Sequence, residues 1–444
     1  MPVSALAFAL ALLTGILFSM RARAANLSNA VRPRVGCRNQ PASKWDLKMR
    51  KLHIKIDFVI IVIGIGCLID TVVFGLIAPL IPIHATELGA DDVQLGLLFA
   101  AYGITATVLM IPFGILSDKI GRIPIVICGN FAGIGVLLYA NANSIPALMI
   151  CRTIQGASAA LTWVSSFALI ADLYPPSERG QKMGIAGIFE GVGYIIGPAT
   201  AGGLAKIGGY SSPFFFSTAL TLVVSFLSVI AFRKIWSVGA RRASSWMEYK
   251  RIFLNRSILV TCVLTVIISA TWGFLEAFYP KYLSSTFAYD SMTTGILFTI
   301  AMVVYAIGRI VFGTLSDRIG RKPILIAGMV IAAIIMPFLF KANGFVTAAI
   351  GLATIFMAIT LTYSVVFPLI FDTVTSLRLK GEPYGAASGA MNIAWTAGFA
   401  IGPLSAGYII ELSNLNTLCI IYAVVFILCA LLGFFLVDEP SARD

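Results

Sequence analysis

Long apolar runs separated by short polar segments dominate the chain. Twelve such runs follow one another, and each is long enough to cross a bilayer, which takes about 20 helical residues. They occupy residues 56–83, 93–116, 123–141, 145–172, 183–207, 213–232, 257–285, 291–315, 322–341, 345–374, 384–411 and 416–437. The runs lack the alternation of barrel strands, and lipid offers no partner to unpaired backbone groups. The predicted fold class is therefore an all-α polytopic membrane protein with twelve transmembrane helices.

Two segments of the chain have nearly the same sequence, 199 residues apart. FGILSDKIGRIPIVICG spans Phe113–Gly129 and FGTLSDRIGRKPILIAG spans Phe312–Gly328, with 12 of 17 positions identical. Each copy is a short charged loop between apolar runs, so the duplicated unit contains a pair of membrane helices. The sequence thus predicts two related six-helix bundles, at residues 56–232 and 257–437, and favours a transporter.

Composition agrees with a membrane protein. The chain is 59% hydrophobic and 12% charged, whereas soluble domains carry about 25% charged residues. There is no G-x-x-x-x-G-K-[ST] loop, so ATP as an energy source is unsupported, and we expect neither an enzyme nor a cofactor. The seven cysteines are scattered, and His53 and His84 lie outside the predicted spans, so no metal site is predicted.

The net charge of +12 follows the predicted topology. Of the 32 Lys and Arg residues, 27 fall in segments on the same side as the N-terminal tail, and only Lys206, Lys281 and Lys341 fall opposite. By the positive-inside rule, both ends of the twelve-span unit are predicted to be cytoplasmic. Residues 233–256 form the predicted basic linker between the bundles, and residues 438–444 form a tail. A nucleic-acid partner is not expected, and a plasma (inner) membrane is favoured over an internal one.

Residues 1–55 form a basic N-terminal extension. Pro2–Met20 is an apolar run followed by Arg21 and Arg23, and it lacks the basic start of a secretory signal. Three interpretations stay open: an extra anchor span, an organellar targeting extension, or a start set too early. The last, with Met49 as the true beginning, is slightly favoured.

Both repeated loops carry Gly, Asp, Gly and Arg, and each half adds a second Asp at the end of a later span. The gating candidates are Gly114, Asp118, Gly121, Arg122 and Asp172 in the first half, and Gly313, Asp317, Gly320, Arg321 and Asp372 in the second. Glycine permits tight turns, while Asp and Arg four residues apart can pair. Such clusters are suited to a latch that holds the bundles in one state and releases them in another. The alternative is a set of solvated loop charges.

The fifth and eleventh spans are rich in glycine and contain proline. Their helix-packing candidates are Gly193, Gly197, Pro198, Gly202, Gly402 and Pro403. Small residues allow helices to approach closely, and proline kinks a helix. We expect tightly packed gating helices, although glycine and proline are common in membrane helices generally.

Several charged residues fall inside predicted spans, where an unpaired charge is costly. Arg152 in the fourth span needs a partner, and Asp70 and Glu190 are the candidates of opposite sign in the same half. We assign these three residues to proton coupling; the alternative for Asp70 is a carboxylate near one surface. Glu276, among aromatic residues, suits either an organic cation or the membrane interface. Arg309 either has a function or extends towards the surface.

The chain resembles a transporter of the major facilitator superfamily over about residues 56–437. The repeated loop matches the superfamily motif of Gly, Asp, Gly and Arg, and Arg152, Gln155 and Gly156 match its Arg-x-x-Gln-Gly motif. The Gly-Pro pattern of the fifth span and the Asp70 pattern of the first resemble drug:proton antiporters and vesicular amine transporters. The resemblance implies alternating access, and implies that the loop clusters stabilise an outward-facing arrangement.

We also predict a substrate site. Its candidates are Asp70, Gln155, Glu276 and Asn392. The chain departs from vesicular amine transporters at Asn392, where they have an acidic residue, and in the second span, where Tyr102–Pro112 lacks their lysine. A monoamine substrate is therefore doubtful.

Three functions are compatible with this sequence. The favoured one is proton-coupled export of a small organic, amphipathic or cationic solute by a monomer in the lipid bilayer. The second is proton-driven or facilitated transport of a neutral metabolite such as a sugar. The third is a membrane scaffold or receptor that has kept the fold without transporting.

Overall fold

A computed structural model describes residues 44–174, 176–233, 255–376 and 384–437. Every regular element within these ranges is a helix. The helices are α2 (Lys44–Glu87), α3 (Asp92–Ile120), α4 (Arg122–Ala132), η1 (Gly133–Asn141), α5 (Ile145–Leu173), α6 (Pro176–Gly208), α7 (Ser212–Phe232), α9 (Arg256–Phe287), α10 (Ser291–Ile319), α11 (Arg321–Ile335), η2 (Met336–Phe338), α12 (Phe345–Ser376), α13 (Tyr384–Leu412) and α14 (Leu415–Leu436).

The predicted all-helical membrane fold is confirmed. In the described ranges, 11 helical segments are long and apolar enough to cross a bilayer, and α4 with η1 and α11 with η2 each count as one segment. The helix outside this set is α6, whose apolar residues are diluted by glycines and by charged residues such as Lys182 and Glu190. Its 33 residues are nevertheless long enough to span, which gives the twelfth predicted helix.

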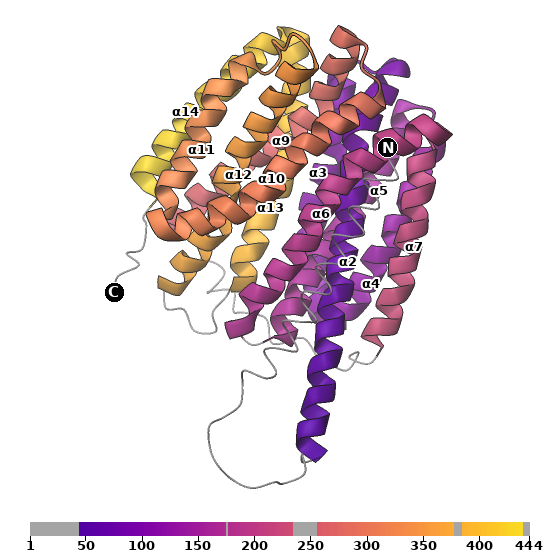
Figure 1. Ribbon diagram of the computed structural model, residues 1–444, viewed down its shortest axis with the longest axis vertical. Coiled ribbons are helices and arrows are strands. Elements are labelled where there is room, and N and C mark those ends of the chain that lie inside the picture. Colours follow the sequence, from indigo (N-terminus) through magenta and orange to yellow (C-terminus); the bar gives the residue numbers. More distant parts are fainter. Residues whose placement is uncertain (1–43, 175, 234–254, 377–383, 438–444) are drawn as a thin grey trace.

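The helices form two groups that lie side by side (Figure 1). The first group, α2 to α7, is drawn in indigo to magenta, and the second, α9 to α14, in orange to yellow. We call them the N-terminal half and the C-terminal half. The linker end of the molecule is the end at which α7 stops at Phe232 and α9 starts at Arg256. The opposite end is called the closed end.

The buried core is shared between the halves towards the closed end and divided at the linker end. One large apolar cluster combines residues of both halves, among them Leu98 and Leu297. Two smaller clusters each belong to one half: the first includes Ile123 and Phe232, and the second includes Ile258 and Val374. The halves are therefore packed together at the closed end and packed separately at the linker end.

Exposure along α3 shows the same separation. Ile104 and Val108 are exposed four residues apart, so they lie on one face of α3. Nearer the linker end, the consecutive residues Ile115 and Leu116 are both exposed. Adjacent exposed residues also occur at positions 310–311 of α10. Since neighbouring side chains point in different directions, the linker-end parts of both helices are uncovered on more than one side.

Glycine is required at the turn of each repeated loop. Gly121 joins α3 to α4 with φ of 100°, and Gly320 joins α10 to α11 with φ of 96°. Residues with a Cβ rarely adopt this conformation. The repeated loop is therefore a tight turn between consecutive spans, as the sequence predicts.

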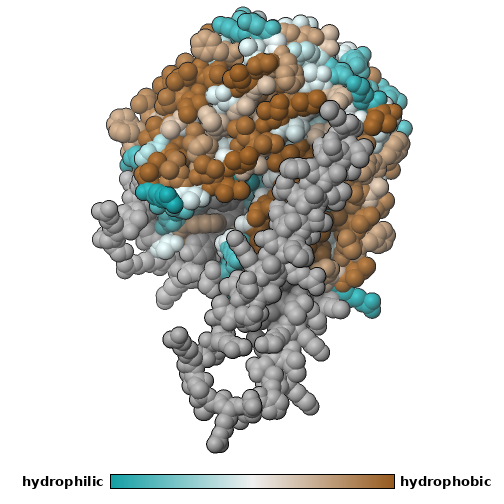
Figure 2. Space-filling model, in the orientation of Figure 1, coloured by the Kyte–Doolittle hydropathy of each residue, from teal (hydrophilic) through white to brown (hydrophobic). Residues whose placement is uncertain are grey.

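Apolar side chains cover much of the outer surface. Figure 2 shows a broad hydrophobic band across the face in view, with hydrophilic residues gathered at its upper rim. Exposed residues of this kind include Ile334 of α11, Phe338 of η2 and Val424 of α14. Together with the spanning helices, this surface is that of a multi-pass integral membrane protein.

The predicted domain boundaries are only partly covered. Residues 1–43 of the N-terminal extension, most of the linker and the tail at 438–444 lie outside the described residues. The first helix begins at Lys44 rather than at residue 56, and its apolar span begins at Phe58.

Candidate functional site

Small residues bring the two halves together towards the closed end. A methyl group on Gly202 of α6 would lie 2.6 Å from the Cα atom of Met292 in α10, and one on Gly96 of α3 would lie 3.3 Å from the Cα atom of Gly407 in α13. Two helix pairs, α6 with α10 and α3 with α13, thus approach each other closely across the contact between the halves. Such close approach is possible only where side chains are absent.

The other predicted packing glycines lie against helices of their own half. A methyl group on Gly197 of α6 would lie 2.8 Å from the Cα atom of Gly75 in α2, and Gly193 lies against Thr71 of the same helix. In the C-terminal half, Gly402 lies against the carbonyl of Ala270 in α9.

The two predicted prolines pack against glycines of the neighbouring helices. Methyl groups on Gly75 and Gly273 would lie 2.9 Å from Pro198 Cδ and 3.0 Å from Pro403 Cδ, respectively. The glycine and proline positions predicted in the fifth and eleventh spans are therefore sites of close helix approach.

An ion pair and a hydrogen bond also connect the halves. Lys281 Nζ of α9 lies 2.7 Å from Asp92 Oδ1 at the start of α3, near the closed end. Deeper in the molecule, Thr107 Oγ1 of α3 donates to Thr396 Oγ1 of α13 at 2.8 Å. The hydrophobic pattern did not predict the Asp92 pair, because both residues lie at ends of helices where charges are ordinary.

Aromatic rings from both halves meet at the middle of this contact. The ring centroids of Phe74 and Phe399 are 5.3 Å apart, and those of Tyr194 and Trp272 are also 5.3 Å apart. Trp272 further contacts Tyr305 at 4.9 Å. These separations are typical of favourable edge and tilted ring contacts.

Arg152 is buried beside this aromatic cluster. Its guanidinium carbon lies 4.6 Å from the ring centroid of Phe99 and 5.0 Å from that of Tyr102. Nη1 donates to Gln155 Oε1 at 3.1 Å, whereas Nε and Nη2 have no hydrogen-bond partner among the described residues. The expected carboxylates, Asp70 and Glu190, have other partners, so the predicted pairing is wrong. Two nitrogens of a buried cation are left available to a ligand.

Glu190 pairs across the interface rather than within its own half. Its Oε2 lies 3.2 Å from Arg309 Nη1 of α10. The Arg309 guanidinium carbon is also 5.5 Å from the ring centroid of Tyr363. This assigns a partner to Arg309, which the sequence left unexplained. The pairing was missed because it joins helices of different halves.

Glu276 is buried in the C-terminal half, 3% exposed, rather than lying at a membrane interface. Its Oε1 accepts a hydrogen bond from Trp272 Nε1 at 2.8 Å, and its Oε2 has no partner among the described residues. A carboxylate oxygen of the C-terminal half and two guanidinium nitrogens of the N-terminal half are therefore left without hydrogen-bond partners among the described residues.

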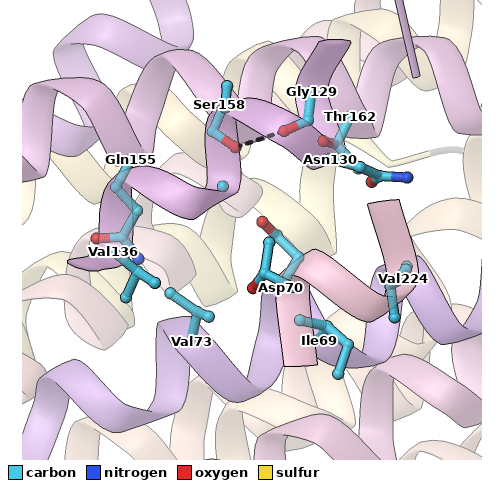
Figure 3. A pocket seen from close by; sticks show the side chains of 14 residues that line it. Ile69, Asp70, Val73, Gly129, Asn130, Val136, Gln155, Ser158, Thr162 and Val224 are labelled. Atoms are coloured by element: carbon cyan, nitrogen blue, oxygen red, sulfur yellow. Dashed lines mark hydrogen bonds between the residues drawn. The ribbon is translucent and has the colours of Figure 1, made fainter. Parts of the chain in front are cut away.

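Asp70 lies inside the N-terminal half, away from the contact between halves. Its Oδ2 accepts a hydrogen bond from Trp163 Nε1 at 2.6 Å. It faces a small chamber, shown in Figure 3, which Gln155 also lines. Asn392, the remaining substrate candidate, is partly buried in α13, and its main-chain carbonyl accepts a bond from Thr396 at 3.1 Å.

The two predicted Asp-Arg-Asp clusters form, each within its own half. Arg122 contacts Asp118, and its Nε lies 3.1 Å from Asp172 Oδ2. Arg321 Nη1 lies 2.8 Å from Asp372 Oδ2, and Asp317 is 3.9 Å from Nη2. Both clusters tie the start of one helix to the end of another at the linker end. Gly114 and Gly313 flank them without close contacts.

Comparison with known proteins identifies the family. The family model of the Major Facilitator Superfamily matches residues 63–395. The chain is 27% identical over 372 residues to the synaptic vesicular amine transporter of Homo sapiens, which covers 82% of this chain and 70% of that protein. It is 25% identical over 346 residues to the quinolone resistance protein NorA of Staphylococcus aureus, covering 76% and 86%.

A solved structure has the same fold. A bacterial homolog of the human lysosomal transporter Spinster, in an inward-facing and occupied conformation, matches with a TM-score of 0.69 and 18% identity. The match covers 88% of this chain and 99% of that one. From its family match and its two-half helical fold, the chain belongs to the Major Facilitator Superfamily and is a membrane transporter.

Proposed function

We propose that the protein exports a small amphipathic or cationic organic solute in exchange for protons, by alternating access between its two halves. The observation that carries this proposal is the buried Glu276 carboxylate, whose Oε2 has no hydrogen-bond partner among the described residues. It lies beside Trp272, next to the aromatic contact between the halves. A carboxylate with aromatic neighbours suits a cation that carries an apolar group.

Proton exchange is assigned to carboxylates in the middle of the spans. Asp70 and Glu190 lie in α2 and α6, and Glu190 is paired with Arg309 across the interface. Gain of a proton by Glu190 would remove the charge attraction between the halves. Intramembrane carboxylates of this kind are typical of proton relays in transporters.

The names of two similar proteins support an organic solute. One is called a vesicular amine transporter and another a quinolone resistance protein. We place the linker end on the cytoplasmic side, because 27 of the 32 Lys and Arg residues belong to segments of that side. A plasma (inner) membrane is the proposed location.

Reconstituted vesicles with an imposed pH gradient test the proposal. A lipophilic cationic dye should move against the proton flux, and the compartment that loses dye should become more acidic. Glu276→Gln should weaken the apparent affinity for the dye roughly 10–100-fold, the loss expected for a hydrogen bond to a charged group. Glu411→Gln, at the exposed end of α13, is the matched control and should behave like the unaltered protein.

Two results would contradict the proposal. Dye movement that ignores the pH gradient would exclude proton antiport. Movement of a neutral sugar, with no effect of Glu276→Gln on any cation, would favour the neutral-metabolite alternative instead.

A further inference from the structure

A small chamber lies inside the N-terminal half, and both polar and apolar side chains line it. Its volume is about 30 Å³, and its lining comes from α2, α4, η1, α5 and α7. A cavity of this size holds one or two water-sized groups. It is too small for an organic solute, and it is separate from the aromatic contact between the halves.

Oxygen atoms converge on this chamber. Figure 3 shows Asp70, Asn130, Thr162 and Ser158 around the chamber, with the Ser158 hydroxyl directed at the carbonyl of Gly129. Of the described residues, no lysine or arginine forms an ion pair with Asp70. A carboxylate in such a place normally acquires a cationic partner, from the protein or from a bound ion.

One amide hydrogen of Asn130 and the hydroxyl hydrogen of Ser158 are committed to other groups. Asn130 Nδ2 donates to Ser228 Oγ at 2.8 Å, which leaves Asn130 Oδ1 to face the chamber. Ser158 Oγ donates to the Gly129 carbonyl at 3.0 Å, which leaves only lone pairs on that hydroxyl oxygen. With the Asp70 carboxylate, the chamber therefore presents several acceptors. A single proton would satisfy only one of them.

The duplicated half provides an internal comparison. Gly129 lies against Thr162, and Gly328 lies against Thr362 in the same way, so these two pairs are equivalent. The residue after Gly328 is Met329, where the N-terminal half has Asn130.

Two further equivalent positions are also apolar in the C-terminal half. Four residues before Thr362 stands Ala358, where the N-terminal half has Ser158. Thr71 donates to the main-chain carbonyl of Glu190 in α6, as Ser269 does to that of Trp395 in α13, so Ile268 corresponds to Asp70.

The C-terminal half folds with an apolar core at these positions. Ile268, Met329 and Ala358 are each no more than 1% exposed. Polar residues are therefore not needed there for helix packing, and burying them costs free energy unless they are satisfied. Their presence in one half only indicates a ligand.

The backbone beside the chamber also differs between the halves. In the N-terminal half, α4 gives way to the 3₁₀ helix η1 at Gly133, a lining residue, and η1 continues for 9 residues. In the C-terminal half, α11 remains α-helical to Ile335, and η2 has 3 residues. Mid-helix 3₁₀ segments often mark functional positions, and interrupted helices supply ion ligands in transporters.

We propose that, while the Asp70 carboxylate is ionised, this chamber binds a small monovalent cation, sodium, coordinated by Asp70, Asn130 and Ser158, so that sodium and the exchanged proton compete for this carboxylate. One carboxylate balances one positive charge, and hard oxygen ligands suit an alkali ion rather than a transition metal. The described residues contain no cluster of three His, Cys, Asp or Glu residues, which agrees with a monovalent ion. The sequence predicts no metal site because its cysteines and histidines are scattered. A sodium ion held by oxygen atoms does not require those residues, so that expectation does not apply to it.

Thermal unfolding of the purified protein in detergent tests this site. At an alkaline pH and constant ionic strength, sodium chloride should raise the unfolding temperature relative to choline chloride, because binding to the folded form stabilises it. Asp70→Asn and Asn130→Ala should abolish the sodium-specific rise. Ser228→Ala, which frees the Asn130 amide, should weaken the apparent sodium affinity roughly 10–100-fold, as removal of outer partners does at other ion sites.

The duplicated half supplies the control. Thr362→Ala alters the position equivalent to Thr162 in the half without a chamber, and it should leave the sodium response unchanged. If Asp70→Asn does not fold, two other measurements test the site. Ser158→Ala should reduce the sodium-specific rise in unfolding temperature, and the unaltered protein should bind radioactive sodium.

Two results would overturn the site. One is a rise in unfolding temperature that choline chloride produces equally, or that persists in Asp70→Asn, because either would indicate a general salt effect. The other is stabilisation by lowering the pH with no response to sodium, which assigns the chamber to a proton alone. Because binding is measured without transport, a negative result leaves proton-driven export standing, and a failed vesicle assay leaves the sodium site standing.

Discussion

At the scale of single residues, the Glu190–Arg309 ion pair is the most consequential contact. Its atoms lie 3.2 Å apart, with side-chain exposures of 11% and 27%. Removing one partner leaves the other charge uncompensated, which costs about 3–5 kcal/mol for a buried pair, less where solvent reaches it. Glu190→Gln or Arg309→Gln alone should therefore lower the thermal unfolding temperature, and the double variant should recover much of the loss.

A double-mutant cycle measured by thermal unfolding checks this pair. Simple addition of the two single effects would show that the residues do not interact, and would remove Glu190 from the proposed coupling route.

Glycine at the turn of the repeated loop gives a second residue-scale prediction. Gly320 has φ of 96° and ψ of 158°, a region that other residues rarely occupy, and the strain of placing a Cβ there is about 1–3 kcal/mol. Gly320→Ala should therefore reduce the unfolding temperature and the yield of folded protein. Gly313→Ala, inside α10 and with nothing within 4 Å of an added Cβ, should have little effect. Equal losses in both variants would contradict the assignment.

The charged residues within spans show what the sequence could and could not predict. Hydrophobic runs identify Asp70, Arg152, Glu190 and Glu276 as intramembrane charges, because each stands alone among apolar residues. They do not identify the partners, since partners depend on which helix faces meet. Glu190 therefore joins Arg309 of the other half, and Arg152 joins Gln155 of its own helix.

At the scale of helices, the closed end depends on α3, α9 and the glycines between the halves. Lys281 of α9 and Asp92 of α3 form the ion pair there, 2.7 Å apart and each about one quarter exposed. Lys281→Gln should shift the population towards opening of this end. Accessibility of a cysteine placed at Ser291 to a membrane-impermeant thiol reagent should increase.

Exchange of the two charges is the control for this pair. The Asp92→Lys and Lys281→Asp double variant should restore low accessibility, because the attraction is regained with opposite polarity. High accessibility in the exchanged protein would mean that the ion pair does not hold the closed end.

The sequence predicts the helices better than their internal irregularities. Twelve apolar runs and the duplicated loop are enough for the spans and for the two halves, since the bilayer sets helix length. The change from α4 to the 3₁₀ helix η1 at Gly133 was not predicted, because no proline or polar break marks it. The chamber was not predicted either, because Asn130, Ser158 and Thr162 come from different parts of the chain.

At the scale of the whole molecule, the halves are joined at the closed end and separated at the linker end. The shared apolar cluster and the glycine contacts hold one end together, while each half keeps a separate cluster at the other. A solved relative with this fold is in an inward-facing conformation. Transport by alternating access requires a second arrangement in which these relations are reversed.

Distances between spin labels at both ends test this central claim most directly. Ile120 and Ile319 are exposed at the linker end, one in each half, and Thr86 and Ser285 are exposed near the closed end. In a background without native cysteines, addition of a transported solute or a change of pH should shorten one distance while it lengthens the other. Distances that stay fixed, or that change together in the same direction, would contradict alternating access by two rocking halves.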